Sequence, residues 1–136
     1  MPSASRHNGP PPVSLRRALI TRHTNLQPVD GLPGVRLHLA HDAAAVWSAT
    51  QDDDGWDAAP IPFWAFAWSG GLALARYLAD HPDAVAGERV LDFGTGSGLV
   101  AIVAARLGAA SVVAADVDPF AETATELNAK ANRVRL

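Results

Sequence analysis

Two acidic residues frame a turn that contains three glycines. The stretch Val90-Leu91-Asp92-Phe93-Gly94-Thr95-Gly96-Ser97-Gly98 runs from apolar residues into this turn, and Asp116 follows 18 residues after the last glycine. Glycine has no Cβ and tolerates positive φ, so a ligand can lie directly against the backbone of such a turn. An acidic residue at the end of the next strand can accept hydrogen bonds from ribose hydroxyls. The pattern therefore predicts a cradle for a nucleoside-containing ligand.

The spacing of the glycines separates this turn from other nucleotide-binding turns. A dinucleotide-binding turn, G-x-G-x-x-G/A, needs a small residue at position 99, where this chain has Leu99. A Walker loop is excluded because no Gly-Lys-Ser/Thr sequence is present. The third glycine is Gly98, which gives D-x-G-x-G-x-G, and the carboxylates of Asp92 and Asp116 suit a cationic ligand better than a pyrophosphate. A purely structural glycine turn is the alternative that these residues leave open.

An aromatic segment precedes the turn. Trp64 and Trp68 are four residues apart, with Phe63 and Phe66 beside them and two glycines after them. We expect Phe66 and Phe63 to pack a helix onto the sheet, and Trp68 to contribute to the ligand site. An aromatic face attracts a cation through the quadrupole of the ring.

The composition limits the classes of protein to consider. The chain has 136 residues, 49% of them hydrophobic and 18% charged, which predicts at most one soluble globular domain. Its longest apolar run, Leu99 to Ala105, is far short of the roughly 20 residues of a membrane helix. A net charge of −3 does not favour a nucleic-acid partner. The absence of cysteine and of a signal pattern favours a cytoplasmic location.

The elements that must position the turn follow from periodicity and from helix start and stop signals. In the second half we expect, in order, a strand, a helix, a strand and a helix at 89–93, 99–107, 111–115 and 120–131, with Pro119 in the first turn of the last helix. This order predicts an α/β fold with a parallel βαβ core. Because the strands are continuously apolar, we expect a sheet covered on both faces. Residues 133–136 are expected to begin another strand.

The first half is expected to form an N-terminal extension. Residues 1–12, rich in proline, predict a disordered tail. After it we expect a helix, a turn, a strand, a helix that Asp42 caps, an acidic loop and a further helix at 13–23, 28–34, 35–39, 43–50, 51–57 and 72–79. We therefore divide the chain into a tail, an extension at 13–60 and a cofactor-binding half at 61–136.

The turn resembles motif I of Rossmann-like, class I methyltransferases that use S-adenosylmethionine (SAM). The segments Pro62–Leu78 and Asn25–Ala40 resemble the group that contains the electron transfer flavoprotein β-subunit lysine methyltransferases and the ribosomal-protein methyltransferases. The resemblance covers roughly Asn25 to the end of the chain. It implies SAM as the cofactor. The cofactor-binding residues would be Trp68, Asp92, Gly94, Thr95, Gly96, Gly98 and Asp116.

The resemblance also implies a role for several of these residues. Asp92 would reach the methionine amino group of SAM, the three glycines would let the backbone pass beside the carboxypropyl and ribose parts, and Asp116 would bind the ribose hydroxyls. Asn128 and Asn132 match an asparagine pair of the family, and we expect them to form capping and helix–loop hydrogen bonds. Asp118 is expected to cap the helix after it. The five histidines show no metal-ligand spacing, and no metal site is predicted.

The reaction that the resemblance implies is methyl transfer from SAM to a lysine of a protein substrate. In the family, a polar-x-x-aromatic motif after the fourth strand lines the acceptor site, and no part of this chain corresponds to it. The catalytic residues would lie beyond Leu136, so none is predicted, and we expect a C-terminally truncated form with little or no turnover. The alternatives are a non-catalytic SAM-binding or sheet-completing module, which could self-associate through an exposed sheet edge, and more weakly an NAD-dependent oxidoreductase fragment.

Overall fold

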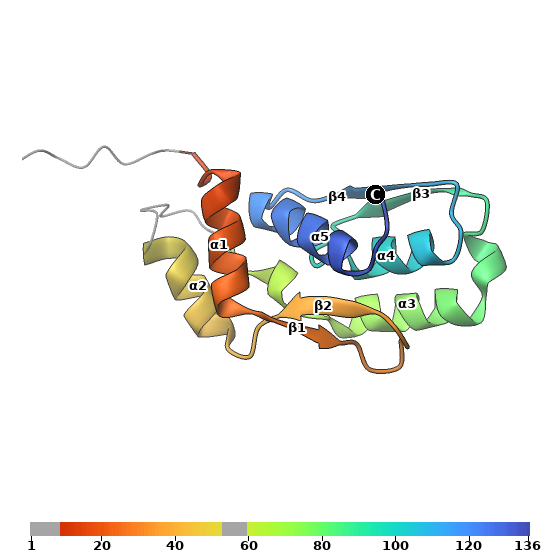
Figure 1. The fold of residues 1–136 in the computed structure, drawn as a ribbon, viewed down its shortest axis with the longest axis horizontal. Helices are drawn as coiled ribbons and strands as arrows, with labels where there is room; N and C mark the ends of the chain where they lie inside the picture. Colours follow the sequence, from red (N-terminus) through yellow and green to blue (C-terminus); the bar gives the residue numbers. More distant parts are fainter. Residues whose placement is uncertain (1–8, 53–59) are drawn as a thin grey trace, which may run out of the picture.

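Two separate two-stranded sheets lie on opposite sides of a pair of helices in the computed structural model (Figure 1). The structure describes residues 9–52 and 60–136. The elements are, in chain order, α1 (Val13–His23), β1 (Asn25–Pro28), β2 (Arg36–Leu39), α2 (Ala43–Asp52), the short 3₁₀ turn η1 (Phe63–Ala65), α3 (Ser69–Asp80), the 3₁₀ turn η2 (Pro82–Ala84), β3 (Arg89–Phe93), α4 (Leu99–Arg106), β4 (Ser111–Ala115) and α5 (Pro119–Ala131).

The parallel βαβ core is present as predicted. Strands β3 and β4 pair in parallel, with Leu91 opposite Val113, and α4 connects them. Strands β1 and β2 form a separate antiparallel hairpin, with Leu26 opposite His38. The α/β fold class is therefore confirmed, with an N-terminal extension made of helices and a hairpin.

Most of the expected helix ends are also confirmed. The carboxylate of Asp42 accepts hydrogen bonds from the backbone N–H groups of Ala44 (2.9 Å) and Ala45 (3.2 Å) at the start of α2. Helix α3 begins three residues earlier than expected, at Ser69, and ends before Pro82 as expected. The strand β1 was not predicted.

The prediction of a strand at residues 133–136 was wrong, because the chain forms the C-terminal end of α5 here. The backbone N–H of Val134 donates to the carbonyl of Ala129 (3.1 Å), and that of Arg133 donates to the carbonyl of Lys130 (3.1 Å). Arg133 itself has φ 57°. These two hydrogen bonds and the left-handed conformation of Arg133 form a Schellman motif. It turns the chain back so that Val134 packs against the core.

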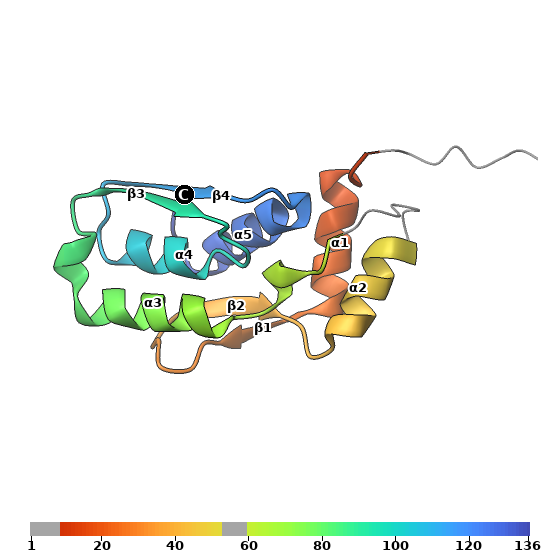
Figure 2. The ribbon, with the colours of Figure 1, turned by 180° about the vertical axis from the view of Figure 1, so that it is seen from behind.

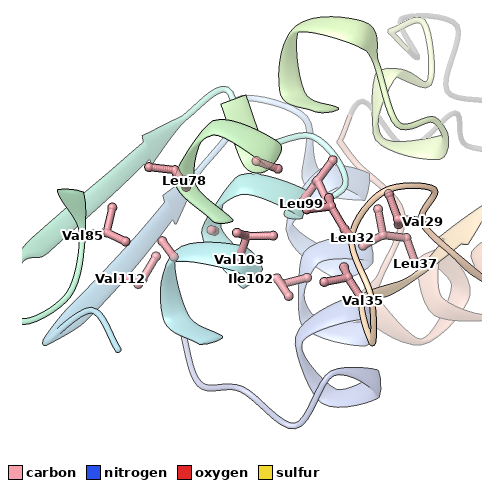
Figure 3. Packing of buried hydrophobic residues seen from close by; sticks show 13 residues of the cluster. Val29, Leu32, Val35, Leu37, Leu78, Val85, Leu99, Ile102, Val103 and Val112 are labelled. Atoms are coloured by element: carbon pink, nitrogen blue, oxygen red, sulfur yellow. The ribbon is translucent and has the colours of Figure 1, made fainter. Parts of the chain in front are cut away.

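The largest buried cluster lies between the hairpin, α3, α4 and the inner face of β4 (Figure 3). Leu37 of β2 and Ile102 of α4 are fully buried within it. A second cluster joins α1 and α2 to η1 and α5, and there the rings of Trp64 and Phe120 stack with centroids 5.7 Å apart. These two clusters fix the hairpin and the aromatic segment against the helices that flank the glycine turn.

The prediction of a sheet covered on both faces was wrong for the described residues. Helices α4 and α5 lie on one side of β3 and β4, and no described element lies on the other side in either view (Figures 1 and 2). On the inner side Val112 is 7% exposed, whereas on the outer side Leu91, Val113 and Phe93 are 63%, 58% and 84% exposed. Alternation in the strands therefore separates a packed face from a bare apolar one.

Parts of two expected segments lie outside the described residues. These are residues 1–8 of the predicted tail and residues 53–57 of the predicted acidic loop. Within the described part of the tail, Pro11 is buried and its carbonyl accepts a hydrogen bond from Arg16 Nη1 (3.1 Å). Among the helices in the described ranges, none combines the length and apolar character that a membrane span requires.

Candidate functional site

A cavity of about 550 Å³ opens where β3 and β4 end. The carboxyl ends of parallel strands are the usual place for a ligand in such a sheet, and this volume is in the range of small-molecule sites. Its walls come from the glycine turn, the aromatic segment, the start of α3 and the residues after β4. Six of the seven predicted site residues line it: Trp68, Asp92, Gly94, Thr95, Gly96 and Asp116.

Asp92 uses one carboxylate oxygen to hold the turn. Its Oδ2 accepts hydrogen bonds from Thr95 Oγ1 (2.6 Å) and from the backbone N–H of Ala101 (3.1 Å), in the first turn of α4. Among the described residues, Oδ1 has no hydrogen-bond partner. One oxygen of Asp92 therefore stabilises the turn, and the other is available to a ligand.

Asp116 also holds the turn, from the end of β4. Its Oδ2 accepts a hydrogen bond from the backbone N–H of Gly96 (2.8 Å), and its Oδ1 accepts one from the N–H of Asp118 (3.0 Å). A carboxylate oxygen has two lone pairs, so each oxygen can accept a further hydrogen bond. The side chain thus connects the two strand ends while retaining capacity for ligand hydroxyls.

The three glycines have different surroundings, although all have positive φ. At Gly94 (φ 74°) a Cβ would meet nothing within 4 Å, so this backbone borders open space. At Gly96 (φ 55°) a Cβ would lie 3.8 Å from the carbonyl of Phe63, because the aromatic segment passes close to the turn. Gly98 (φ 83°) is buried, and its Cβ would lie only 2.9 Å from Thr125 Cγ2 of α5. The structure therefore places Gly98 at a helix contact and not in the cavity lining.

The aromatic segment forms the opposite wall of the cavity. Trp68 is 52% exposed, and its Nε1 donates to the carbonyl of Phe63 (2.8 Å). The Trp68 ring lies 5.6 Å from that of Phe63 and 5.8 Å from that of Phe66, between centroids. Phe66 packs against the second core cluster, as a structural residue does, but not onto the sheet as expected, and it also lines the cavity. Phe63 was expected to pack too, but it is 55% exposed at the cavity, which is a correction.

Comparison with known proteins finds similarity to methyltransferases. The model of the ribosomal protein L11 methyltransferase (PrmA) family matches residues 76–136, which contain the glycine turn and both acids. The electron transfer flavoprotein beta subunit lysine methyltransferase of Danio rerio is 43% identical over 102 residues, covering 75% of this chain and 38% of that protein. The Homo sapiens protein of the same name is 40% identical over 107 residues, with the same coverage of both chains. The similarity to these methyltransferases therefore extends over about three quarters of this chain.

The relatives are longer than this chain. The chain spans 38% of the length of both lysine methyltransferases. Among solved structures, the ribosomal protein L11 methylase from Lactobacillus delbrueckii subsp. bulgaricus is 40% identical, with a TM-score of 0.44, and the match covers 51% of this chain and 35% of that one.

Asp118 also lines the cavity, a placement that the sequence analysis missed. It caps α5 as predicted, since its Oδ1 accepts the N–H of Phe120 (2.8 Å). Burial raises the pKa of Asp118 to about 6, against the lowering effect of the Phe120 hydrogen bond. The nearby charge of Asp116 raises this pKa further, and that of Arg16 lowers it. The cavity therefore borders one carboxyl group that titrates close to neutrality.

The pKa of Asp118 predicts a pH-dependent difference between the wild type and an Asp118→Asn variant, which keeps an uncharged capping residue of the same shape. Between pH 3.8 and about 6 the folded wild type binds more protons at Asp118 than the unfolded chain does. Its stability relative to the variant should therefore fall as the pH rises through this window. Urea denaturation of both proteins across a pH series measures the difference, and a difference that stays constant with pH contradicts the prediction.

Asn128 and Asn132 of α5 connect the turn to the hairpin. Asn128 is fully buried, its Nδ2 donates to the carbonyl of Ser97 (2.8 Å), and its Oδ1 accepts the N–H of His38 (2.7 Å). Asn132 Oδ1 accepts the N–H of Arg36 (2.9 Å), and its Nδ2 donates to the Arg36 carbonyl and to that of Asn128. The predicted structural role is confirmed, and it extends from helix capping to the joining of three segments.

Proposed function

We propose that the cavity binds SAM and that this chain supplies the cofactor-binding part of a protein methyltransferase. The observation that carries the proposal is that one cavity contains the glycine turn, an available carboxylate oxygen of Asp92, Asp116 and the Trp68 ring. SAM has an ammonium group, a sulfonium and a ribose, and each has a complementary group in these walls. The similarity to methyltransferases supports the same proposal.

The residues would hold the cofactor through charge and shape. Oδ1 of Asp92 would accept hydrogen bonds from the ammonium group, and Asp116 would accept them from the ribose hydroxyls. The backbone at Gly94 and Gly96 lets the ligand lie against the turn. Trp68 presents its ring to the cation. SAM supplies a methyl group bonded to a positively charged sulfur, and the chain's own contribution is to orient that group.

The surroundings of Leu99 disfavour the NAD alternative. Leu99 is 3% exposed and belongs to the large core cluster between the hairpin, α3 and α4. A dinucleotide-binding turn needs a small residue at this position so that helix and strand pack closely. Here a large side chain occupies the position as part of the core, so the turn lacks a feature of the dinucleotide fold.

We further propose that the methyl acceptor is a lysine amine of a protein. The relatives that cover most of this chain are named as lysine methyltransferases of a protein subunit. Displacement at the methyl group requires a neutral amine in line with the carbon–sulfur bond, so positioning would supply most of the rate acceleration. Incubation with SAM that has an isotopically labelled methyl group, followed by mass spectrometry of a candidate protein, identifies the modified residue. Label on a residue other than lysine contradicts the assignment.

Isothermal titration calorimetry tests the cofactor assignment. We expect SAM to bind the wild type, and Asp116→Asn to raise the dissociation constant about 30-fold, because a hydrogen bond to a charged group contributes roughly 1.5–3 kcal/mol. Asp83→Asn is the matched control, since Asp83 is exposed in η2, outside the cavity. Its SAM affinity should equal that of the wild type. Binding of NADH without binding of SAM would overturn the proposal.

The bare face of the β3–β4 sheet favours a second candidate function, a module that completes its sheet with another copy of the chain. Parallel strands are normally covered on both faces, and here Phe93 and Leu91 on the outer face are 84% and 63% exposed in the described structure. Two copies could cover this apolar surface and add strands at the unpaired edges. Sedimentation velocity over a range of concentrations measures this, and a monomer at every concentration argues against it.

A further inference from the structure

Helix α5 contacts two consecutive carbonyls of the glycine turn. Thr125 Oγ1 donates to the carbonyl of Gly96 (3.2 Å), and Asn128 Nδ2 donates to the carbonyl of Ser97 (2.8 Å). Thr125 and Asn128 are three residues apart on α5, so they lie on one face of the helix. Both are buried, and neither lines the cavity.

The turn needs such contacts because of its composition. Glycines occupy three of its five positions from 94 to 98, and glycine has access to more backbone conformations than any other residue. Asp116 fixes the N–H of Gly96 from the strand side (2.8 Å), and the N–H of Gly98 donates to the carbonyl of Thr95 (2.9 Å), which orients the planar Ser97–Gly98 peptide. Neither of these bonds engages the Gly96 carbonyl. The hydrogen bonds from α5 restrain that carbonyl and add a second restraint on the Ser97–Gly98 peptide, and a binding site that is ordered beforehand loses less entropy when its ligand binds.

We propose that Thr125 and Asn128 are positioning residues for the cofactor, which order the glycine turn by fixing the carbonyls of Gly96 and Ser97. This inference rests on the proposed binding of SAM at the turn. It extends the cofactor site to a layer of side chains that do not touch the ligand. The proposal also connects the hairpin to the turn, because Asn128 accepts the backbone N–H of His38 at the same time.

A matched pair of variants at Thr125 tests the proposal. Thr125→Val keeps the shape and both γ-substituents beside Gly98 but lacks the hydroxyl, whereas Thr125→Ser keeps the hydroxyl. By titration calorimetry we expect Val to raise the dissociation constant for SAM about fivefold, the effect of one net hydrogen bond. Ser should remain within about twofold of the wild type. Asn128→Asp, which keeps the acceptor for His38 and loses the donor, should bind more weakly than Thr125→Val.

Amide hydrogen exchange of the ligand-free proteins gives a second readout, independent of SAM. The amides of residues 94–98 should exchange faster in Thr125→Val than in Thr125→Ser or in the wild type. If Thr125→Val melts at a lower temperature but binds SAM like the wild type well below that temperature, and its turn exchanges normally, the proposal is wrong. If the wild type itself does not bind SAM, the proposed function fails, while the exchange data still decide whether α5 orders the turn. Should Asn128→Asp fail to fold, the Thr125 pair decides alone.

Discussion

An Asn128→Ala variant is expected to lower the free energy of unfolding by about 4 kcal/mol. The substitution removes both hydrogen bonds of a fully buried amide, and it leaves the carbonyl of Ser97 and the N–H of His38 without this partner. An unsatisfied buried polar group costs roughly 1–3 kcal/mol, and this substitution leaves two polar groups without their partner. Domains of this size have a total stability of about 5–15 kcal/mol, so this one side chain accounts for a large share.

Urea denaturation followed by circular dichroism measures this effect, with Asn25→Ala as the control. Asn25 is also a hydrogen-bonded asparagine, with its Nδ2 2.9 Å from His41 Nε2, but this pair is exposed. Water can replace an exposed hydrogen bond, so the control should change the free energy of unfolding by less than about 1 kcal/mol. If both variants lose the same free energy of unfolding, the two buried hydrogen bonds by which Asn128 connects the turn to the hairpin have no special importance for stability.

Gly98→Ala is expected to destabilise the chain by about 3 kcal/mol. A non-glycine residue in the left-handed region costs roughly 1–2 kcal/mol, and Gly98 has φ 83°. The new Cβ would also lie 2.9 Å from Thr125 Cγ2 and 3.0 Å from Thr125 Oγ1, both on a buried side chain. Relief of that overlap requires α4 and α5 to separate or Thr125 to rotate, and overpacking of this kind costs about 1–3 kcal/mol.

Gly94→Ala separates the two contributions to this loss. Gly94 has a similar φ of 74°, but a Cβ there would meet nothing within 4 Å. Only the cost of the left-handed backbone conformation applies, so we expect the free energy of unfolding to fall by about 1–2 kcal/mol. Thermal and urea denaturation of the two variants give the comparison. If Gly94→Ala loses as much stability as Gly98→Ala, the contact between Gly98 and Thr125 does not matter for folding.

The sequence was sufficient where structure depends on local signals. The apolar strands, the capping residue Asp42, Pro119 in the first turn of α5 and Gly108 after α4 each identified an element boundary within a few residues. Local signals also misled, as in the predicted coverage of the sheet on both faces. In residues 133–136 basic and apolar side chains alternate, which is typical of a strand, but the left-handed conformation of Arg133 ends α5 instead.

Most residues of the candidate site could be predicted from the sequence, but the different structural role of each residue could not. Six of the seven residues predicted from the glycine turn, its two acids and the aromatic segment line one cavity. The separate role of Gly98 depends on Thr125, which lies on another helix. The partner of Asn128 on the hairpin is His38, 90 positions away in the chain. Contacts between distant segments leave no periodic signal in a single sequence, so packing partners of this kind emerge only from the fold.

The pairing of Asn132 with Arg36 has a consequence for how the chain meets other copies of itself. The side-chain amide of Asn132 forms hydrogen bonds with both the backbone N–H and the carbonyl of Arg36. The side chain of Asn128 accepts the backbone N–H of His38. Side chains of α5 thus take the place of a neighbouring strand along this edge of β2 and hinder the addition of a foreign strand there. Among the strands in residues 9–52 and 60–136, fibril-like growth under stress is expected to start at β1 or at the β3–β4 pair.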